Sequence, residues 1–256
     1  MIHPTAIIQP GAKIADNVSI GPFSVIGENV SIGSGTTVAA HVVIEGWTEI
    51  GSDNQLYQFS SIGAPPQDLK YAGEQTCLKI GDRNRIREFV TLNRGTAEGG
   101  GVTSIGNDNL FMAYSHVAHD CIVNDHTILA NSATLAGHVE IESSAILGGL
   151  SAVHQFCRIG CHTMISGGAM VAQDIPPYTV AQGDRAKTMG LTLIGMKRRG
   201  FSEETIRGIK KAYRIIFRSG MRLEEALALV VKELESTAEL DHFVNFIKQS
   251  QRGIAR

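Results

Sequence analysis

Four histidines in the middle of the chain are spaced so that they could act together. They are His116, His119, His138 and His154, and Asp120 directly follows the second of them. An imidazole with a pKa near ~6.5 can take a proton from an alcohol close to neutral pH. Three or four nitrogen, sulfur or oxygen ligands can also hold a zinc ion. These residue types therefore indicate general base catalysis or metal binding, and their spacing leaves both open.

The histidines lie within a repeat of six residues. An apolar residue, usually Ile, Val or Leu, returns at every sixth position from Ile8 to Leu92 with one interruption, and again from Ile105 to Val171. Neither a helix nor an alternating strand has this period, whereas hexapeptide repeats are typical of a parallel β-helix. Gly, Asn, Asp and Ser between the apolar positions tolerate the positive φ of tight corners. We therefore predict a mostly β solenoid with an aliphatic core.

The solenoid would gather the histidines on one edge. If three hexapeptides make one coil, residues eighteen apart lie on successive coils, about 4.8 Å from each other. On this rule Gly137 and then Gln155 stack on His119, and His138 and His154 are immediate neighbours of the stacked positions. Convergence of several imidazoles on one edge favours a functional site over solvated turn residues.

Two insertions interrupt the repeat. The first covers residues 63–79 and contains Asp68 and Lys70, and the second covers residues 93–104 with a run of glycines. Long loops on a repeat scaffold often hold binding groups. The charged residues favour a binding role for the first loop, whereas the second could equally be a tolerated surface insertion.

The period becomes helical after two consecutive prolines near residue 177. Apolar residues at helical spacing predict helices at about 203–220, 223–234 and 240–249. We therefore predict a β-helical domain over residues 1–188 and a small C-terminal α-helical domain over residues 189–256.

Composition narrows the class of protein further. The formal net charge of −2 gives no reason to expect nucleic acid or an anionic membrane as a partner. No apolar run reaches the ~18 residues of a membrane span, and the repeat begins with no room for a signal peptide. Four cysteines without a CxxC pair suit reduced thiols. These features predict a cytoplasmic protein.

Several stretches carry a more specific resemblance that extends over essentially the whole chain. They are QDLKYAGE at residues 67–74, HVAHDC at 116–121, LAGHV at 135–139, VHQFC at 153–157 and MKRRGF at 196–201. Together they closely resemble the acyl-[acyl-carrier-protein]–UDP-N-acetylglucosamine O-acyltransferases, which catalyse the first step of lipid A biosynthesis. The resemblance implies a left-handed triangular β-helix and a homotrimer with sites between subunits.

The resemblance also implies a reaction. An R-3-hydroxyacyl group would pass from the phosphopantetheine thioester of acyl carrier protein to the glucosamine 3-hydroxyl of UDP-N-acetylglucosamine, with no further cofactor and no metal. It implies that His119 is the general base, that Asp120 orients it, and that the backbone N–H of Gly137 lies near the thioester oxygen. This agrees with the chemistry, because an attacking alcohol needs a base and the resulting oxyanion needs a donor.

Binding residues follow from the same resemblance. The implied nucleotide-sugar contacts are Asp68, Lys70, His116, His138, His154, Gln155, Arg198 and Arg199. The implied acyl-chain groove contains Gly167, Met170 and Arg185. The chain departs from the usual pattern of relatives at Asn93, at Thr192 and at Asp184-Arg185, which weakens the inference at those places.

A basic stripe on the first long predicted helix could bind an acidic partner. Its members recur at helical spacing and are Arg207, Lys210, Lys211, Arg214 and Arg218. Acyl carrier proteins are strongly acidic, so the stripe is a candidate docking surface for the carrier protein. An ordinary solvated helix face explains the spacing equally well.

Three other functions remain possible from the sequence. They are an N-acyltransferase of the same pathway, a zinc lyase of the γ-carbonic anhydrase type, and a scaffold without catalytic activity. The lyase would need three histidines around a metal, and it gives no role to the DLK loop, the KRRG stretch or the helical tail.

Overall fold

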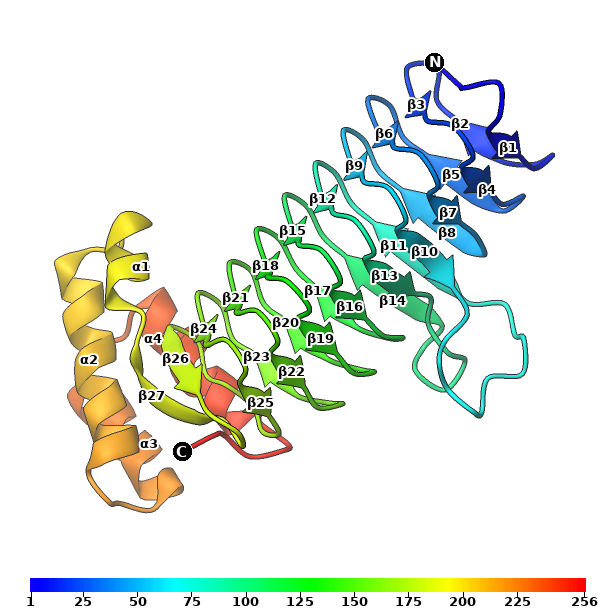
Figure 1. Ribbon diagram of the computed structural model, residues 1–256. Helices are drawn as coiled ribbons and strands as arrows, with labels where there is room; N and C mark the ends of the chain where they lie inside the picture. The colour runs from blue at the N-terminus through cyan, green and yellow to red at the C-terminus, as the bar shows by residue number, and fades with distance from the viewer.

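The chain winds into a left-handed parallel β-helix with three flat faces. The computed structural model describes residues 1–256, and Figure 1 shows the coils stacked in a row with four helices at the end opposite the N-terminus. Each coil contributes one strand to each of three sheets of nine, eight and ten strands. The strands of a coil follow one another from sheet 1 to sheet 2 to sheet 3, so the prism has a 1–2 edge, a 2–3 edge and a 3–1 edge.

The strands are mostly two residues long. Sheet 1 consists of β1 Ile7–Ile8, β4 Val25–Ile26, β7 Val43–Ile44, β10 Ser61–Ala64, β13 Thr91–Asn93, β16 His116–Val117, β19 Thr134–Leu135, β22 Ala152–Val153 and β25 Met170–Val171. Sheet 2 consists of β2 Lys13–Ile14, β5 Val30–Ile32, β8 Trp47–Ile50, β11 Cys77–Ile80, β14 Val102–Ile105, β17 Ile122–Val123, β20 Glu140–Ile141 and β23 Arg158–Ile159. Sheet 3 consists of β3 Ser19–Ile20, β6 Thr37–Val38, β9 Gln55–Leu56, β12 Arg85–Ile86, β15 Leu110–Phe111, β18 Ile128–Leu129, β21 Ile146–Leu147, β24 Met164–Ile165, β26 Thr179–Gln182 and β27 Lys187–Leu191.

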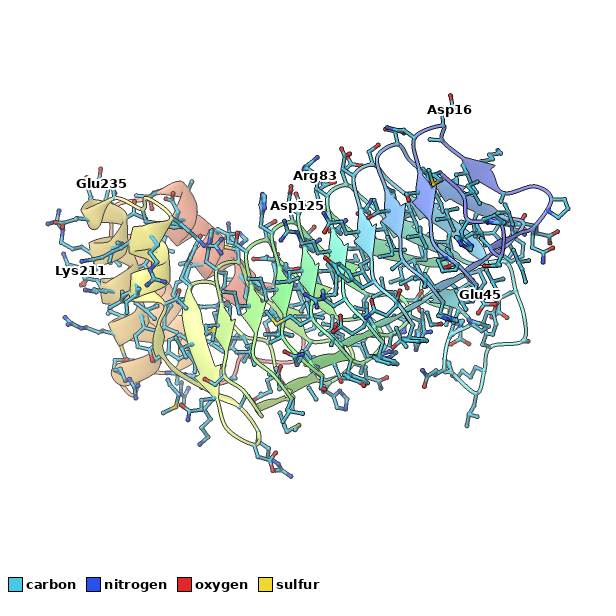
Figure 2. The ribbon with its side chains drawn as sticks, turned by 45° about the horizontal axis from the view of Figure 1, so that its top comes forward. Asp16, Glu45, Arg83, Asp125, Lys211 and Glu235 are labelled. Carbon is cyan, nitrogen blue, oxygen red and sulfur yellow. The ribbon has the colours of Figure 1, made fainter.

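Two of the edges and the helical end can be located by charged residues. In Figure 2, Asp16, Arg83 and Asp125 follow the 2–3 edge, Glu45 lies on the 1–2 edge, and Lys211 marks the helical end. Strand pairing confirms the eighteen-residue stacking rule, because His116 pairs with Thr134 and Val117 with Leu135.

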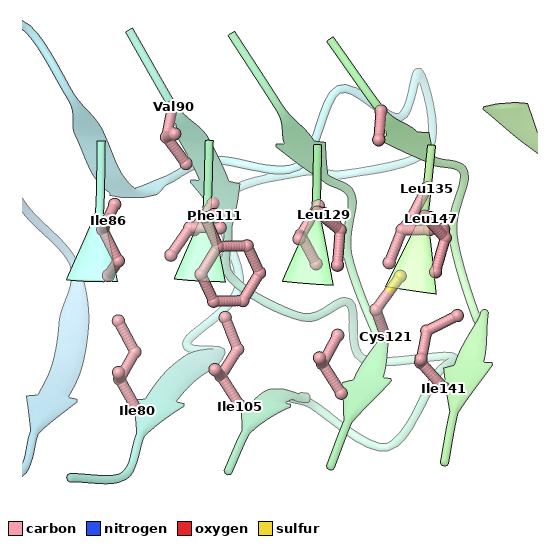
Figure 3. Packing of buried hydrophobic residues seen from close by; sticks show 14 of the residues in the cluster. Ile80, Ile86, Val90, Ile105, Phe111, Cys121, Leu129, Leu135, Ile141 and Leu147 are labelled. Carbon is pink, nitrogen blue, oxygen red and sulfur yellow. The ribbon is translucent and has the colours of Figure 1, made fainter. Parts of the chain in front are cut away.

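The repeated aliphatic residues form the core. The second residue of nearly every strand points inward, and 38 buried residues make one continuous hydrophobic cluster along the solenoid. Figure 3 shows part of this column, in which Ile105, Phe111 and Leu129 from neighbouring strands meet in the centre of the prism. Burying an aliphatic side chain of this size contributes about 1.5–3 kcal/mol, so the period of six is the main determinant of the fold.

The prediction about corner residues was only partly right. Many left-handed corners are occupied by aromatic residues, including Phe23, Phe59, Phe89 and Tyr114, with φ between 59° and 65°. These rings and His41 stack along the 3–1 edge with centroids 4.8–5.2 Å apart, which offsets part of the backbone strain. The predicted glycines instead permit close approach, since a Cβ on Gly21 would lie 2.7 Å from the backbone of the next coil.

Both insertions leave the solenoid at the 1–2 edge. The first joins β10 to β11 and the second joins β13 to β14 on the next coil (Figure 1). The flanking strands remain paired through the insertions, because β11 pairs with both β8 and β14. The two loops are therefore held next to each other by the regular coils beneath them.

A strand pair and four helices close the C-terminal end. The helices are α1 Leu193–Arg198, α2 Glu203–Arg218, α3 Leu223–Glu233 and α4 Ala238–Lys248. The three longer ones coincide with the predicted helices to within a few residues, and the Ser202 hydroxyl caps α2 by accepting from the Thr205 amide at 3.0 Å. The sequence did not predict α1 or the antiparallel pairing of β27 with β26, which extends sheet 3 to Leu191. None of the four helices has both the length and the apolar composition needed to cross a bilayer.

Candidate active site

His119 is held in one orientation by the carboxylate beside it. The Nδ1 atom of His119 lies 2.8 Å from Oδ2 of Asp120. A carboxylate only accepts, so Nδ1 carries the proton and donates, and Nε2 of the neutral ring keeps a free lone pair. This tautomer makes Nε2 the atom that can accept a proton from a substrate.

Asp120 is buried and hydrogen-bonded to the second loop. Its side chain is 1% exposed. Its Oδ1 accepts from the backbone N–H of Thr96 at 2.9 Å, and its Oδ2 accepts from the Thr96 hydroxyl at 2.6 Å. The Asp120 amide in turn donates to the Thr103 hydroxyl at 2.8 Å. The carboxylate is therefore fixed, and it fixes the imidazole.

Gly137 stacks directly on His119, as the eighteen-residue rule predicts. A Cβ added to Gly137 would lie 2.5 Å from Cε1 of the imidazole, so only glycine leaves room for the ring. The backbone N–H of Gly137 donates to no acceptor within the chain. A free N–H beside a free imidazole nitrogen is the pair of groups that acyl transfer to an alcohol requires.

Two further histidines surround His119. The His138 ring is perpendicular to the His119 ring at a centroid distance of 5.1 Å, and it stacks on Phe156 at 4.4 Å. His116 is bonded through Nδ1 to the Thr91 hydroxyl at 2.7 Å. Burial lowers the pKa of His116 and of His138, and the proximity of His119 lowers both further. Both rings therefore favour the neutral form.

The two loops are joined to each other beside this cluster. Nη2 of Arg94 donates to the Tyr71 hydroxyl at 2.9 Å, and its Nη1 donates to the Gly63 carbonyl at 2.8 Å. Lys70 forms an exposed ion pair with Glu98 at 3.1 Å. The second loop lies against Asp120, because a Cβ added to Gly99 would overlap the Asp120 carboxylate.

Comparison with known proteins identifies the family. A family model described as UDP N-acetylglucosamine O-acyltransferase, domain 2, matches residues 174–255, and a bacterial transferase hexapeptide model matches residues 11–46 and 103–137. The acyl-[acyl-carrier-protein]–UDP-N-acetylglucosamine O-acyltransferases of Janthinobacterium sp. (strain Marseille) and Herminiimonas arsenicoxydans are 56% and 54% identical, over 100% of this chain and 99% of each relative. The chain belongs to this O-acyltransferase family.

Solved structures of the family have the same fold over the whole chain. The UDP-N-acetylglucosamine O-acyltransferase of Moraxella catarrhalis is 48% identical with a TM-score of 0.97, covering 100% of this chain and 99% of that one. The enzyme of Bacteroides fragilis is 45% identical with a TM-score of 0.98 and full coverage of both chains. Of the functions left open by the sequence, the family match supports the O-acyltransferase.

The predicted residues of this O-acyltransferase do not all meet in a single chain. His154 lies one coil beyond Gly137 on the 1–2 edge, where its Nδ1 is 3.1 Å from the Gln155 carbonyl oxygen. Arg199 lies on the 2–3 edge instead, with Nη1 3.2 Å from Nδ1 of His162, and Arg198 ends α1 beside it. Arg199 and the end of α1 therefore lie away from the edge that carries His119.

The predicted acyl-groove residues are also distributed over the surface. Met170 shares the outer face of sheet 1 with His116, through the pairing His116–Thr134–Ala152–Met170 on successive coils. Gly167 lies on the 3–1 edge between β24 and β25, and Arg185 lies in the turn between β26 and β27. Sheet 1 thus provides a continuous surface from the histidine cluster to Met170.

Sequence reasoning missed the contribution of the second loop. Thr96 holds Asp120, and Arg94 holds the first loop, although from the sequence residues 93–104 could equally be a tolerated surface insertion. The sequence Arg-Gly-Thr directly after a strand could have drawn attention to this loop. Its role could not be predicted, because it depends on the contact between Thr96 and Asp120, which are 24 residues apart.

Proposed function

We propose that this protein transfers an R-3-hydroxyacyl group from acyl carrier protein to the glucosamine 3-hydroxyl of UDP-N-acetylglucosamine, with His119 as the general base. The reaction is inferred from membership of the O-acyltransferase family, and it is the first step of lipid A biosynthesis. The observation that supports the role of His119 is its Nδ1–Asp120 hydrogen bond, which leaves Nε2 free beside the unbonded N–H of Gly137.

The reaction follows from this geometry. Nε2 of His119 accepts the proton of the 3-hydroxyl while the hydroxyl oxygen attacks the thioester carbonyl carbon. The carbonyl oxygen becomes an oxyanion, to which the Gly137 N–H donates. When the tetrahedral intermediate collapses, the carbon–sulfur bond breaks and the phosphopantetheine thiolate takes the proton from the His119 imidazolium. The products are the ester and the free thiol, and the enzyme returns to its starting state.

The same groups argue against a metal in the catalytic step. His119, Asp120 and His138 have potential ligand atoms within 4.8 Å of one another. However, Nδ1 of His119 is engaged with Asp120, and the proposed reaction needs the lone pair on Nε2 for the substrate proton, so a metal held by His119 would remove the base. We propose that the acyl carrier protein's phosphopantetheine is the one prosthetic group that takes part.

Substrate binding is proposed to use both loops and the edge. Lys70 is exposed and paired to Glu98 in a weak surface ion pair, so a diphosphate can replace Glu98 as its partner. His116, His138, His154 and Gln155 present polar groups along the edge, and a lowered pKa favours the neutral form of His116 and His138. The outer face of sheet 1 up to Met170, with Gly167 and Arg185 beyond it, is the proposed path of the acyl chain.

The working form is proposed to be a homotrimer. The histidine edge of one chain is an open ridge, and Arg198 and Arg199 lie on another edge. A neighbouring copy can form the second side of a substrate pocket along this edge. It can also bring its own arginines to the nucleotide phosphates. A cytoplasmic location agrees with the four free cysteines of the chain.

Mass spectrometry of the products tests the proposed reaction. The purified protein is incubated with UDP-N-acetylglucosamine and a mixed pool of R-3-hydroxyacyl carrier proteins. We expect an O-acylated nucleotide sugar, with one chain length dominating. Absence of any acylated sugar, or acylation of an amine acceptor in place of the hydroxyl, would contradict the proposal.

A further inference from the structure

A second group of reactive side chains lies away from the proposed active site. Glu142 and Cys161 follow β20 and β23 on the 2–3 edge, and His242 comes from α4, which Figure 1 shows beside the last coils. Nε2 of His242 lies 2.7 Å from Oε2 of Glu142, and the Cys161 amide donates to the same oxygen at 2.8 Å. The Glu142 carboxylate, the Cys161 thiol and the His242 imidazole have potential ligand atoms within 4.8 Å of one another.

The surroundings of this cluster orient its ligands. Nη2 of Arg158 lies 3.8 Å from Oε1 of Glu142, which leaves Oε2 facing His242. Tyr178, which is 3% exposed, packs beside Cys161, and its amide donates to the Cys161 carbonyl at 2.8 Å. Neither the proposed reaction nor the substrate-binding residues use any of these groups.

We propose that Glu142, Cys161 and His242 bind a divalent cation of the zinc class. One thiolate, one imidazole and one carboxylate form a ligand set that zinc prefers, and water can complete a tetrahedron. Ligand atoms around a tetrahedral zinc lie roughly 3.3–3.8 Å apart, so side-chain adjustments of about 1 Å convert the observed cluster into a site. Binding displaces the proton of the Cys161 thiol and any proton on the coordinating nitrogen of His242.

The ion would connect two parts of the chain that are far apart in sequence. Glu142 and His242 are 100 residues apart, and the solenoid and α4 meet at this cluster. The guanidinium of Arg158 also lies over the Phe246 ring at 4.5 Å, so the helix is already seated on the coils. A cation that binds the folded chain and not the unfolded chain stabilises the folded state, and here it would hold α4 in place.

Cobalt titration of the full-length protein tests the site directly. The protein is reduced, freed of metal with a chelator and titrated with Co²⁺ while absorbance is recorded. We expect one equivalent per chain, a near-ultraviolet thiolate-to-cobalt charge-transfer band, and loss of the band when Zn²⁺ is added. We also expect Zn²⁺ to raise the Tm by several degrees.

Two variants and one matched control assign the ligands. Cys161→Ser should abolish the charge-transfer band, and His242→Ala should weaken cobalt binding at least tenfold, with circular dichroism confirming that both remain folded. Cys77→Ser removes a half-buried thiol of β11 and should change nothing. Burial raises the pKa of the Cys121 and Cys157 thiols to about 12 and about 11, so neither offers a thiolate.

The outcomes separate a metal site from a hydrogen-bonded cluster. If wild-type protein shows no charge-transfer band and no change in Tm with Zn²⁺, the three side chains form hydrogen bonds only and the proposal is wrong. A band that persists in Cys161→Ser also overturns it. Acyl transfer is measured in parallel and should survive chelation, so a failure here is distinguishable from a failure of the proposed function.

Discussion

Asp120 accepts hydrogen bonds at both carboxylate oxygens, and this determines how His119 can react. The carboxylate receives donors from Thr96 on one side and from the imidazole on the other. Because its position depends on the second loop, the geometry of the proposed base is built from two segments that are 24 residues apart along the chain.

Replacing the proposed base should remove nearly all activity. We expect His119→Ala to lower kcat by about 10²–10⁴-fold, because the sugar hydroxyl then has no proton acceptor. His126→Asn is the matched control, since His126 is an exposed histidine on the 2–3 edge with φ of 57°, which asparagine tolerates. kcat is measured from initial rates of product formation at saturating substrates, and His119→Ala retaining half of wild-type activity would exclude His119 as the base.

Thr96 should behave as a positioning residue. Thr96→Val removes the hydroxyl donor at 2.6 Å and keeps the backbone donor, so Asp120 should hold the imidazole less firmly. We expect kcat to fall by roughly tenfold, with little change in the KM for acyl carrier protein or for UDP-N-acetylglucosamine. Thr96→Ser should restore most of kcat, and a valine variant with wild-type kcat would show that the hydroxyl has no part in positioning.

The half-buried residue His116 should make the free energy of unfolding depend on pH. Burial, and then the proximity of His119, hold its pKa below the usual value of 6.5 in the folded state. The unfolded chain therefore binds more protons as pH falls below about 6.5, and the free energy of unfolding falls in that window. Urea unfolding at pH 7.5 and at pH 5.5 should show a smaller loss for His116→Gln than for wild type. Equal losses in the two proteins would contradict this assignment.

At the scale of elements, α2 presents a charged face at the far end of the molecule. Lys211, labelled in Figure 2, and Arg207 and Arg214 are exposed, whereas Lys210 is half-buried. Arg218 is engaged with the Met189 carbonyl at 3.1 Å. The face thus keeps most of its predicted positive charge available for an acidic partner.

Reversing this charge should weaken use of the carrier protein. We expect Lys210→Glu, Lys211→Glu and Arg214→Glu together to raise the KM for acyl carrier protein, leaving nucleotide-sugar binding nearly unchanged. Wild-type transfer should slow with added salt more than transfer by the triple variant, because the Debye length is about 8 Å at physiological strength. Lys13→Glu, at the opposite end of the solenoid, is the control. If wild type and the triple variant have the same KM for acyl carrier protein and the same salt dependence, the stripe is only a solvated helix face.

Local periodicity explains which elements could be predicted. The six-residue period of the strands and the basic stripe of α2 are patterns among residues that are close together in the sequence. Both could therefore be predicted from the sequence alone. The six-residue α1 could not be predicted, because its sequence contains Gly195 and its burial depends on Met196 packing in the helical domain. The proposed active site is likewise predictable only where it follows the repeat. Stacking by eighteen residues correctly placed Gly137 on His119. The hydrogen bond from Thr96 to Asp120 could not be predicted, because Thr96 lies in an irregular loop outside the repeat.

At the scale of the whole molecule, the separation of His119 from Arg199 predicts that sites are shared between chains. His119→Ala and the Arg198→Ala, Arg199→Ala double variant should each be nearly inactive as pure oligomers. Co-expressed chains should regain activity, because at about a quarter of randomly formed interfaces an intact histidine edge faces an intact pair of arginines. Native mass spectrometry would confirm mixed trimers. Mixed trimers without activity, or an active monomer in sedimentation, would contradict the shared site.

The stacking of nearly identical coils also has a mechanical consequence. Each coil contacts only its immediate neighbours, and the helices cover one end while the N-terminal coil exposes Ile7 and half-buries Ile8 at the other. Under tension applied to its ends, such a chain yields first at the uncovered end and releases one coil at a time. Eighteen residues pulled straight extend to about 60 Å. The molecule would therefore lengthen in a series of nearly equal steps, one for each coil that is released.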